Sequence, residues 1–161
     1  MRHKPDAIDV DLLKILQTKG RTKRGDLAQQ VGLSISSASE RLRKLEEMGI
    51  IRGYHALLDS RMLGLELTAF VAVTADSSRR FKKLIELATE CEEVVECHAI
   101  TGDGSHLLKV RTKNTESLER LLSLIQSWPG VVNTKTSIVL STPKENTAIS
   151  LQYLQEDVEK K

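Results

Sequence analysis

The sequence GDLAQQVGLSISSASERLRKLEEMGIIRG, residues 25–53, has the pattern of two short helices joined by a tight turn. Gly32 supplies a stop for the first helix, and Ser34 supplies an N-cap for the second. A short helix that presents hydroxyl and guanidinium groups, held by another helix across a Gly-containing turn, is the arrangement that enters a DNA major groove. The apolar side chains that recur at helical spacing are Leu27, Ala28 and Val31 in the first segment, and Ala38, Leu42 and Leu45 in the second.

The surface of the second helix is rich in serine. Serine is a poor helix former at an exposed helix position, because its hydroxyl competes for backbone hydrogen bonds. Hydrogen bonds from these hydroxyls to DNA phosphates or base edges would explain their presence. Two amphipathic helices and a turn also occur in plain bundles with solvated basic faces, but motif and charge together favour DNA binding. The serines are Ser34, Ser36, Ser37 and Ser39, and the basic residues of this region are Arg21, Lys23, Arg24, Arg41, Arg43, Lys44 and Arg52.

Charge is shared unevenly along the 161 residues. Residues 1–58 hold eleven Lys and Arg against seven Asp and Glu, and residues 59–161 hold thirteen against fifteen. A basic front part and a mildly acidic rear part indicate a nucleic-acid module joined to a second module. The chain shows no apolar run that would span a membrane and no signal-peptide core, so we expect a cytoplasmic protein with no membrane partner.

The sequence offers no convincing catalytic or metal site. Cys91, Cys97, His98 and His106 match no compact ligand spacing, and lone cysteines commonly serve as small hydrophobic residues. Cys97 and His98 are adjacent on a predicted strand, so their side chains point to opposite faces and form no dyad. We therefore expect no enzyme activity, no catalytic residues, no metal and no cofactor.

The first domain is predicted to span residues 1–58. Asp6 caps a first helix that ends at Lys19 and Gly20, which makes a three-helix unit. Residues 51–58 are predicted to form a short exit strand, as in a winged helix-turn-helix. Residues 59–64 are the expected linker.

The periodicity changes after residue 64, and residues 65–150 predict a second domain. Its apolar segments follow the order β-α-β-β-α-β, the ferredoxin-like pattern of an α+β fold. Two helices would cover one face of the sheet, and dimerisation would hide the other. Residues 151–161 are left as a C-terminal tail. The strands are expected at 67–75, 94–101, 106–111 and 131–142.

Four motifs in order resemble the Lrp/AsnC (feast/famine) family of transcription regulators. The first two, IDVDLLKILQTKGR (8–21) and LAQQVGLSISSASERLRKLEEMGIIRGYHALLD (27–59), resemble the opening helix and the helix-turn-helix with its exit strand. TGDGSHLLKV (101–110) resembles an effector-domain loop, and PGVVNTKTSIVLSTPKENTAISL (129–151) the closing strand and tail. The resemblance implies a sequence-specific regulator of double-stranded DNA that forms homodimers, often octamers, and that commonly binds an amino acid or related metabolite between effector domains.

The resemblance also implies site residues. Arg41 is the foremost expected DNA contact, because a guanidinium can hold a phosphate or a guanine edge with two hydrogen bonds. Arg43 and Lys44 are expected to touch phosphates. The full set of expected DNA contacts is Ser34, Ser36, Ser37, Ser39, Arg41, Arg43 and Lys44.

The expected effector loop departs from the family pattern. Relatives that bind amino acids frequently carry an aromatic-Asp-aromatic segment after Gly-Asp, whereas this chain has Gly104, Ser105 and His106. Ser105 offers only a neutral hydroxyl to an ammonium group, while His106 can meet a carboxylate. Turn geometry alone also explains the glycines. The expected effector contacts are Gly102, Asp103, Gly104, Ser105, His106, Thr134 and Thr136.

Two functions therefore stay open for the chain. The first is a transcription regulator that responds to an amino acid or related metabolite. The alternative is an effector-independent architectural DNA-binding protein of the same fold, which the altered loop favours.

Overall fold

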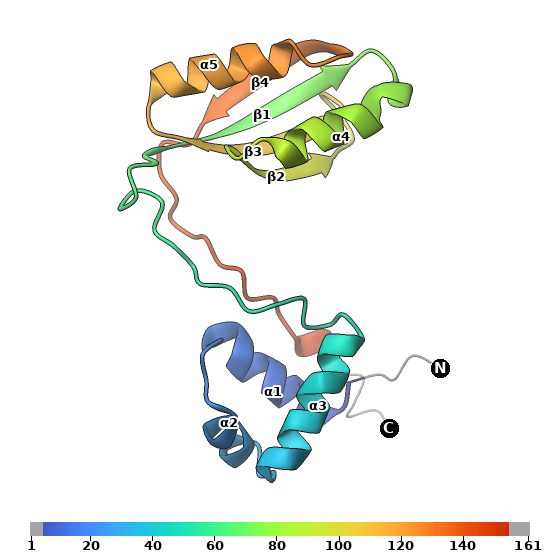
Figure 1. Ribbon diagram of the computed structural model, residues 1–161, viewed down its shortest axis with the longest axis vertical. Helices are drawn as coiled ribbons and strands as arrows, with labels where there is room; N and C mark the ends of the chain where they lie inside the picture. The colour runs from blue at the N-terminus through green and yellow to red at the C-terminus, as the bar shows by residue number, and fades with distance from the viewer. Residues whose placement is uncertain (1–4, 155–161) are drawn as a thin grey trace. The chain divides into compact units, whose positions relative to one another are not determined.

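The computed structural model of the chain describes residues 5–154, which fall into two compact units (Figure 1). Leu58–Pro143 form the second unit, and the first combines the residues before Leu58 with those from Lys144 onward. The side chain of Gln17 explains this return, because its Nε2 donates to the Ile149 carbonyl (3.0 Å) and its Oε1 accepts from the Ile149 N–H (3.1 Å). Residues 144–150 therefore pack with the first unit, although the sequence pattern groups them with the second.

The first unit contains the three predicted helices. Asp6 and Asp9 form a capping box at the first, in which the Asp9 N–H donates to Asp6 (2.9 Å) and the Asp6 N–H donates to Asp9 (3.1 Å). Ser34 caps the third helix by accepting from the Ser37 N–H (3.1 Å), and Gly32 follows the second helix at φ +67°. Both predicted caps are confirmed. The helices are α1 (Ala7–Thr18), α2 (Arg24–Gln30) and α3 (Ile35–Glu47).

One apolar cluster holds the three helices together. Leu12 from α1, Leu27 from α2 and Leu42 from α3 are almost completely buried and contact one another. Burial of each such leucine contributes roughly 1.5–3 kcal/mol. The half-buried side chains around the cluster are Ile8, Ile15, Leu16, Val31 and Ile51.

The predicted exit strand over residues 51–58 is wrong for the structure, which contains no strand there. A strand requires a ladder partner, and none of the described residues pairs with this segment. A side-chain contact holds the segment instead, because the Tyr54 hydroxyl donates to the Glu46 carboxylate at 2.9 Å. Burial and this hydrogen bond raise the pKa of Tyr54 to about 12.

The second unit is an antiparallel four-stranded sheet in the order β2-β3-β1-β4, with two helices over one face (Figure 1). The predicted β-α-β-β-α-β order is confirmed. The fourth strand ends at Ile138 instead of residue 142, because Ile138 already pairs with Ala69 near the start of β1. The elements are β1 (Leu67–Ala75), a short 3-10 turn (Ser78–Arg80), α4 (Phe81–Glu90), β2 (Val94–Ala99), β3 (His106–Thr112), α5 (Thr115–Gln126) and β4 (Val131–Ile138).

Strand alternation separates a helix-covered face from an open face. Val71 and Leu108 pair across the sheet and lie in the core under α4 and α5, where Trp128 is also buried. Phe70 and Lys109 pair on the other face, which carries apolar and charged side chains side by side. The remaining buried core residues are Ala69, Val73, Leu84, Ala88, Val110, Leu118, Leu121 and Ile125.

His106 opens β3 on the helix-covered face and is only 1% exposed. Its ring makes an edge-to-face contact with Phe81 of α4, with centroids 4.8 Å apart and planes at 82°. Nδ1 lies 3.0 Å from the Ser105 hydroxyl, and Nε2 is buried without a hydrogen-bond partner. Burial lowers the pKa of His106 below its ordinary value of 6.5.

The second unit should therefore lose stability as the pH falls through 6.5. The unfolded chain binds a proton on His106 below this pH while the folded chain excludes it, which costs up to about 1.4 kcal/mol per pH unit until the folded pKa is reached. Denaturant unfolding between pH 7.5 and 5.5, followed by fluorescence of the single residue Trp128, measures the loss. His106→Gln should flatten this pH dependence and His55→Gln, at an exposed site, should not; equal slopes for wild type and His106→Gln would contradict the assignment.

Candidate nucleic-acid interface and effector region

Helix α3 has one buried face and one exposed face. Ala38, Leu42 and Leu45 are at most 5% exposed and pack into the first unit. The exposed side chains of the opposite face therefore form the surface available to a partner. They are Ser36, Ser37, Glu40, Arg43, Lys44 and Glu47, with the half-buried Ser39 beside them.

The four serines at the start of α3 have different local roles. The Ser34 hydroxyl caps the helix and lies 3.0 Å from the Ser36 hydroxyl and 2.8 Å from the Ser37 hydroxyl. Ser34 is therefore committed to the helix end, whereas Ser36 and Ser37 lie exposed in the first turn of α3. A hydroxyl has one donor and two acceptor lone pairs, so both retain capacity for a further hydrogen bond.

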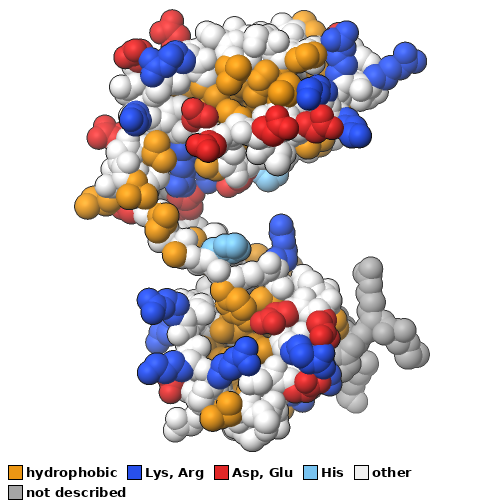
Figure 2. Space-filling model, in the orientation of Figure 1, with side chains coloured by type: hydrophobic (Ala, Val, Ile, Leu, Met, Phe, Trp, Pro, Cys, Tyr) orange, Lys and Arg blue, Asp and Glu red, His pale blue; other side chains and the backbone are white. Residues whose placement is uncertain are grey.

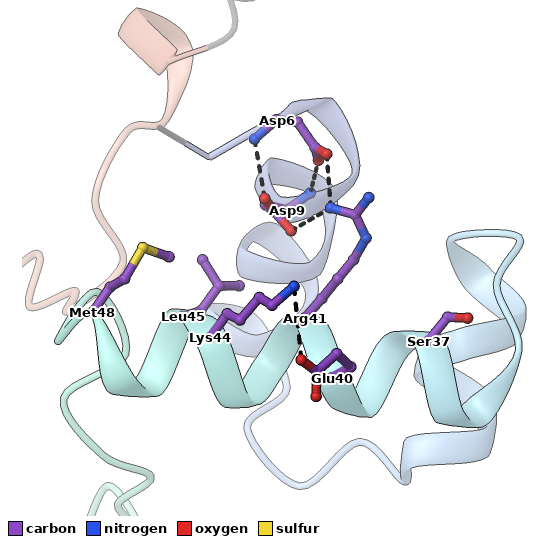
Figure 3. A pocket seen from close by; sticks show the side chains of 8 residues that line it. All are labelled: Asp6, Asp9, Ser37, Glu40, Arg41, Lys44, Leu45 and Met48. Carbon is purple, nitrogen blue, oxygen red and sulfur yellow. Dashed lines mark hydrogen bonds and ion pairs between the residues drawn. The ribbon is translucent and has the colours of Figure 1, made fainter. Parts of the chain in front are cut away.

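Arg41 extends toward the N-terminal end of α1 (Figure 3). Its Nη1 donates to Asp6 Oδ2 at 2.7 Å and to Asp9 Oδ1 at 2.8 Å. The Asp9 side chain is 4% exposed and that of Arg41 is 29% exposed. These hydrogen bonds, first to Asp9 and then to Asp6, raise the pKa of Arg41. In this structure the foremost expected DNA contact is thus engaged inside its own domain, a link between two helices that the sequence reasoning did not foresee.

A shallow hollow of about 300 Å³ opens beside this ion pair between α1 and α3 (Figure 3). Its wall combines the two aspartates of α1 with polar and apolar side chains of α3. The lining residues are Asp6, Asp9, Ser37, Glu40, Arg41, Lys44, Leu45 and Met48.

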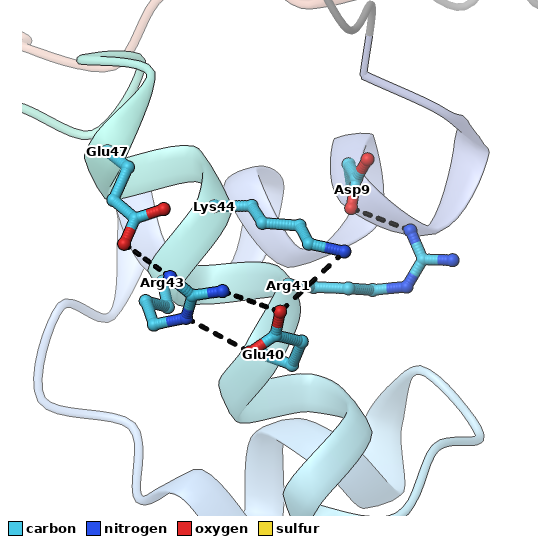
Figure 4. A network of polar contacts seen from close by, with 6 residues as sticks. All are labelled: Asp9, Glu40, Arg41, Arg43, Lys44 and Glu47. Carbon is cyan, nitrogen blue, oxygen red and sulfur yellow. Dashed lines mark hydrogen bonds and ion pairs between the residues drawn. The ribbon is translucent and has the colours of Figure 1, made fainter.

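Arg43 lies in a network of charges on the exposed face of α3 (Figure 4). Its Nη2 and Nε donate to the two carboxylate oxygens of Glu40 at 2.7 and 3.0 Å, and its Nη1 donates to Glu47. Lys44 reaches the same Glu40 carboxylate at 3.7 Å. The hydrogen bond from Arg43 lowers the pKa of Glu40, so this carboxylate is ionised at neutral pH.

Helix α2 contributes to the same surface through Arg24. A second hollow, of about 310 Å³, lies between its side chain and α3. Arg24 and Glu40 are functional candidates that the sequence reasoning did not select, although Arg24 belongs to the basic cluster recognised there. The lining residues are Arg24, Ser36, Ser39, Glu40, Arg43 and Glu46.

The loop before β3 is built around two glycines. Gly102 and Gly104 have φ values of +98° and +108°, and a Cβ on Gly104 would lie 3.0 Å from the Val73 carbonyl oxygen. Ser105 donates to the same oxygen from its N–H (2.8 Å) and its hydroxyl (3.2 Å). Ser105 thus anchors the loop to β1 in this structure.

Three of the other expected effector residues lie on the helix-covered face of the sheet, and Asp103 lies in the loop. His106 and Thr134 both pair with Val73 and face the helices, and the Thr134 hydroxyl accepts from the Gln126 side chain (2.9 Å). Thr136 lies two residues further along the same face. Asp103 instead lies at the exposed loop, where Lys135 approaches it at 3.9 Å. His106, Thr134 and Thr136 thus share the helix-covered face, while Asp103 lies in the loop.

The described residues contain neither a metal-binding cluster nor a helix that could span a membrane. Across residues 5–154, no three His, Cys, Asp or Glu side chains gather as ligands for a metal ion. Within the same part of the chain, no helix has the length and apolar content needed to cross a membrane.

Comparison with known proteins finds matches over both units. Residues 68–149 match the Lrp/AsnC ligand binding domain, and residues 5–52 match a winged helix-turn-helix DNA-binding domain. The HTH-type transcriptional regulator FL11 of Pyrococcus horikoshii is 39% identical over 152 residues, covering 94% of this chain and 100% of the relative. The leucine-responsive regulatory protein of Escherichia coli is 34% identical over 150 residues, covering 91% and 92% of the two chains.

Solved structures agree with the sequence matches. A transcriptional regulator from Neisseria meningitidis in complex with L-methionine superposes with a TM-score of 0.89 at 31% identity, covering 94% of this chain and 99% of that one. A feast or famine regulatory protein from M. tuberculosis, also complexed with L-methionine, gives 0.84 at 33% identity, covering 89% and 97%. The chain therefore belongs to the Lrp/AsnC family and is a DNA-binding transcription regulator, with a helix-turn-helix unit followed by a ferredoxin-like ligand-binding domain.

Proposed function

We propose that the exposed face of α3 enters the major groove of double-stranded DNA and reads its sequence. The observation that carries this proposal is the exposure of hydroxyl and cationic groups on the helix that follows the tight turn at Gly32. Arg24 of α2 borders the same surface and is suited to a phosphate. The proposed direct contacts are Ser36, Ser37, Ser39, Arg43 and Lys44.

Arg41 and Ser34 enter this proposal as residues that position α3. Arg41 would have to leave two charge-assisted hydrogen bonds to reach DNA, and the buried Asp9 would then lose its partner. Ser34 would have to release the helix end. Both costs favour an indirect role, in which these side chains hold the reading surface in place.

We further propose that the second unit binds an amino acid or a related small metabolite. The family domain matched by residues 68–149 and the two relatives solved with L-methionine support this. Asp103 and Lys135 present opposite charges beside the loop and suit the ammonium and carboxylate groups of such a ligand. Gly102 and Gly104 give the loop its shape and Ser105 and His106 anchor it at the start of β3, while Thr134 and Thr136 lie on the neighbouring β4.

Self-association is part of the same proposal. The open face of the sheet carries Phe70, which is 36% exposed, and Leu140 just after β4 is 92% exposed. Hydrophobic side chains also reach the surface of the helical layer, where Ile85 and Leu124 are 44% and 50% exposed (Figure 2). A homodimer formed through the sheets would cover the first set, and an octamer or other higher assembly the second. A regulator of this kind works beside its DNA, so we expect it in the cytoplasm.

The alternative is an effector-independent architectural protein of the same fold. The specific observation in its favour is that the Ser105 hydroxyl donates to the Val73 carbonyl and offers no charge to an ammonium group. The effector experiment below distinguishes the two functions.

Lys44→Ala should weaken binding to all double-stranded DNA and reduce the slope of log K against log salt by about one, because one phosphate contact is lost. Fluorescence anisotropy with a labelled duplex at several salt concentrations measures both quantities. Lys83→Ala is the matched control, since the two lysine side chains are 55% and 54% exposed and Lys83 lies on α4 of the other unit. Equal salt slopes for the two variants would contradict the proposed surface.

Arg41→Ala should destabilise the first unit by about 1.5–3 kcal/mol, because the buried Asp9 carboxylate loses a charged hydrogen-bond donor. Denaturant unfolding followed by circular dichroism measures this loss. Asp9→Asn separates the two possible roles of Arg41: it should weaken DNA binding if Arg41 positions α3, since the buried one of its two ionic partners is neutralised. Unchanged or tighter DNA binding by Asp9→Asn would instead identify Arg41 as a direct contact.

An amino-acid effector should raise the melting temperature of the protein, since ligand at a hundred times Kd stabilises the folded state by about 2.7 kcal/mol. A thermal-shift screen with L-methionine, the other amino acids and related metabolites tests this. Asp103→Asn should reduce the shift, whereas Ser105→Ala should lower the melting temperature and keep the shift. No shift with any ligand, together with intact DNA binding, would support the architectural alternative.

A further inference from the structure

The exposed face of α3 carries acidic side chains, which a surface that only binds phosphates would lack. Ser36, Glu40, Arg43 and Glu47 follow the spacing i, i+4, i+7 and i+11, so they lie along one line of the helix. Basic and acidic side chains lie side by side over α3 (Figure 2). Glu40 and Glu47 balance the charges of Arg43 and Lys44, so the middle of the face carries no net charge. Phosphates repel carboxylates, and this face is therefore poorly suited to grip the DNA backbone alone.

Glu40 lies within this line and contacts both Arg43 and Lys44 (Figure 4). Arg43 holds both of its oxygens in a two-pronged contact, at 2.7 and 3.0 Å, and Glu47 holds the other edge of the same guanidinium. A carboxylate has about four lone-pair sites, so Glu40 retains acceptor capacity after this contact. Its side chain is 49% exposed and can reach a partner.

Only some base edges can donate to such an acceptor. In the major groove the donors are the amino groups of cytosine (N4) and adenine (N6), and Glu or Asp is the usual partner of cytosine. Guanine O6 and N7 and thymine O4 are acceptors, so they would face the carboxylate with no proton between them. A desolvated carboxylate without a donor is costly, and this cost discriminates between sequences.

We propose that Glu40 is a specificity-determining residue, which accepts a hydrogen bond from a cytosine amino group in the major groove and disfavours sites that lack one there. This inference rests on the proposed use of the exposed face of α3 as the DNA surface. Arg43 positions the Glu40 carboxylate. The carboxylate in turn weakens the attraction of Arg43 and Lys44 for DNA phosphates, whatever the base sequence. Glu40 thus raises the ratio of specific to non-specific affinity by both effects.

Selection from a random double-stranded DNA library, followed by affinity measurement, tests the proposal on the full chain. Wild type should select a motif with cytosine at a fixed position. Glu40→Gln should shift that position toward adenine, since glutamine pairs with adenine N6 and N7, and should lower the specificity ratio about tenfold. Its affinity for random-sequence duplex should rise, with a salt slope steeper by about one, because a cation is released toward phosphates.

Glu47→Gln is the matched control, because it removes the other carboxylate bound to Arg43 and leaves Glu40 in place. It should raise the affinity for random-sequence duplex and keep the wild-type motif. If Glu40→Gln selects the wild-type motif with the wild-type specificity ratio, the role of Glu40 is overturned while DNA reading stands. If wild type itself selects no motif, the proposed reading function is overturned, and the role of Glu40 with it.

Discussion

The ion pair between Arg41 and Asp9 joins the first helix to α3, the helix proposed to read DNA. Asp9 caps α1 through its capping box with Asp6 and, from the same carboxylate, accepts from Arg41 of α3. A carboxylate so nearly buried requires a charged partner, because desolvation without one costs several kcal/mol. The Asp9 side chain therefore takes part in the N-terminal cap of α1 and also binds Arg41 of α3. The apolar contacts among Leu12, Leu27 and Leu42 hold the helices together but leave them freer to slide or rotate.

The elements predicted correctly from the sequence are those determined by residues close together in the chain. Capping residues such as Asp6 and Ser34, and runs of alternating or helical apolar residues, depend on neighbours in the chain, and the structure contains them. The direction of Arg41 escaped prediction, because helical spacing leaves a long side chain free to bend toward another helix. The side of the sheet on which His106 and Thr134 lie was likewise beyond the sequence, because alternation defines two faces of a strand but not which of them the helices cover. The strand predicted at residues 51–58 is absent because none of the described strands pairs with that segment.

The two units use charge in different ways. On α3, Glu40 and Arg43 neutralise each other within the surface proposed to read DNA, and in that proposal the pairing lowers general attraction to phosphates in favour of selectivity. In the second unit, Asp103 of the glycine-shaped loop and Lys135 of β4 are both more than three-quarters exposed, and the proposed function assigns their charges to a small zwitterion. Family membership accounts for the presence of both units. The particular side chains account for how this member can differ from its relatives.

The contact between Gln17 and Ile149 joins residues 132 positions apart in the chain. The second unit is thus an insertion within the first in terms of contacts, and both of its ends are tied to the same helical unit. During synthesis the ribosome must deliver residue 149 before this contact forms, after the whole ligand-binding sheet has emerged. The contact between Gln17 and Ile149 is therefore one of the last to form, whereas the apolar cluster of Leu12, Leu27 and Leu42 requires only the first part of the chain.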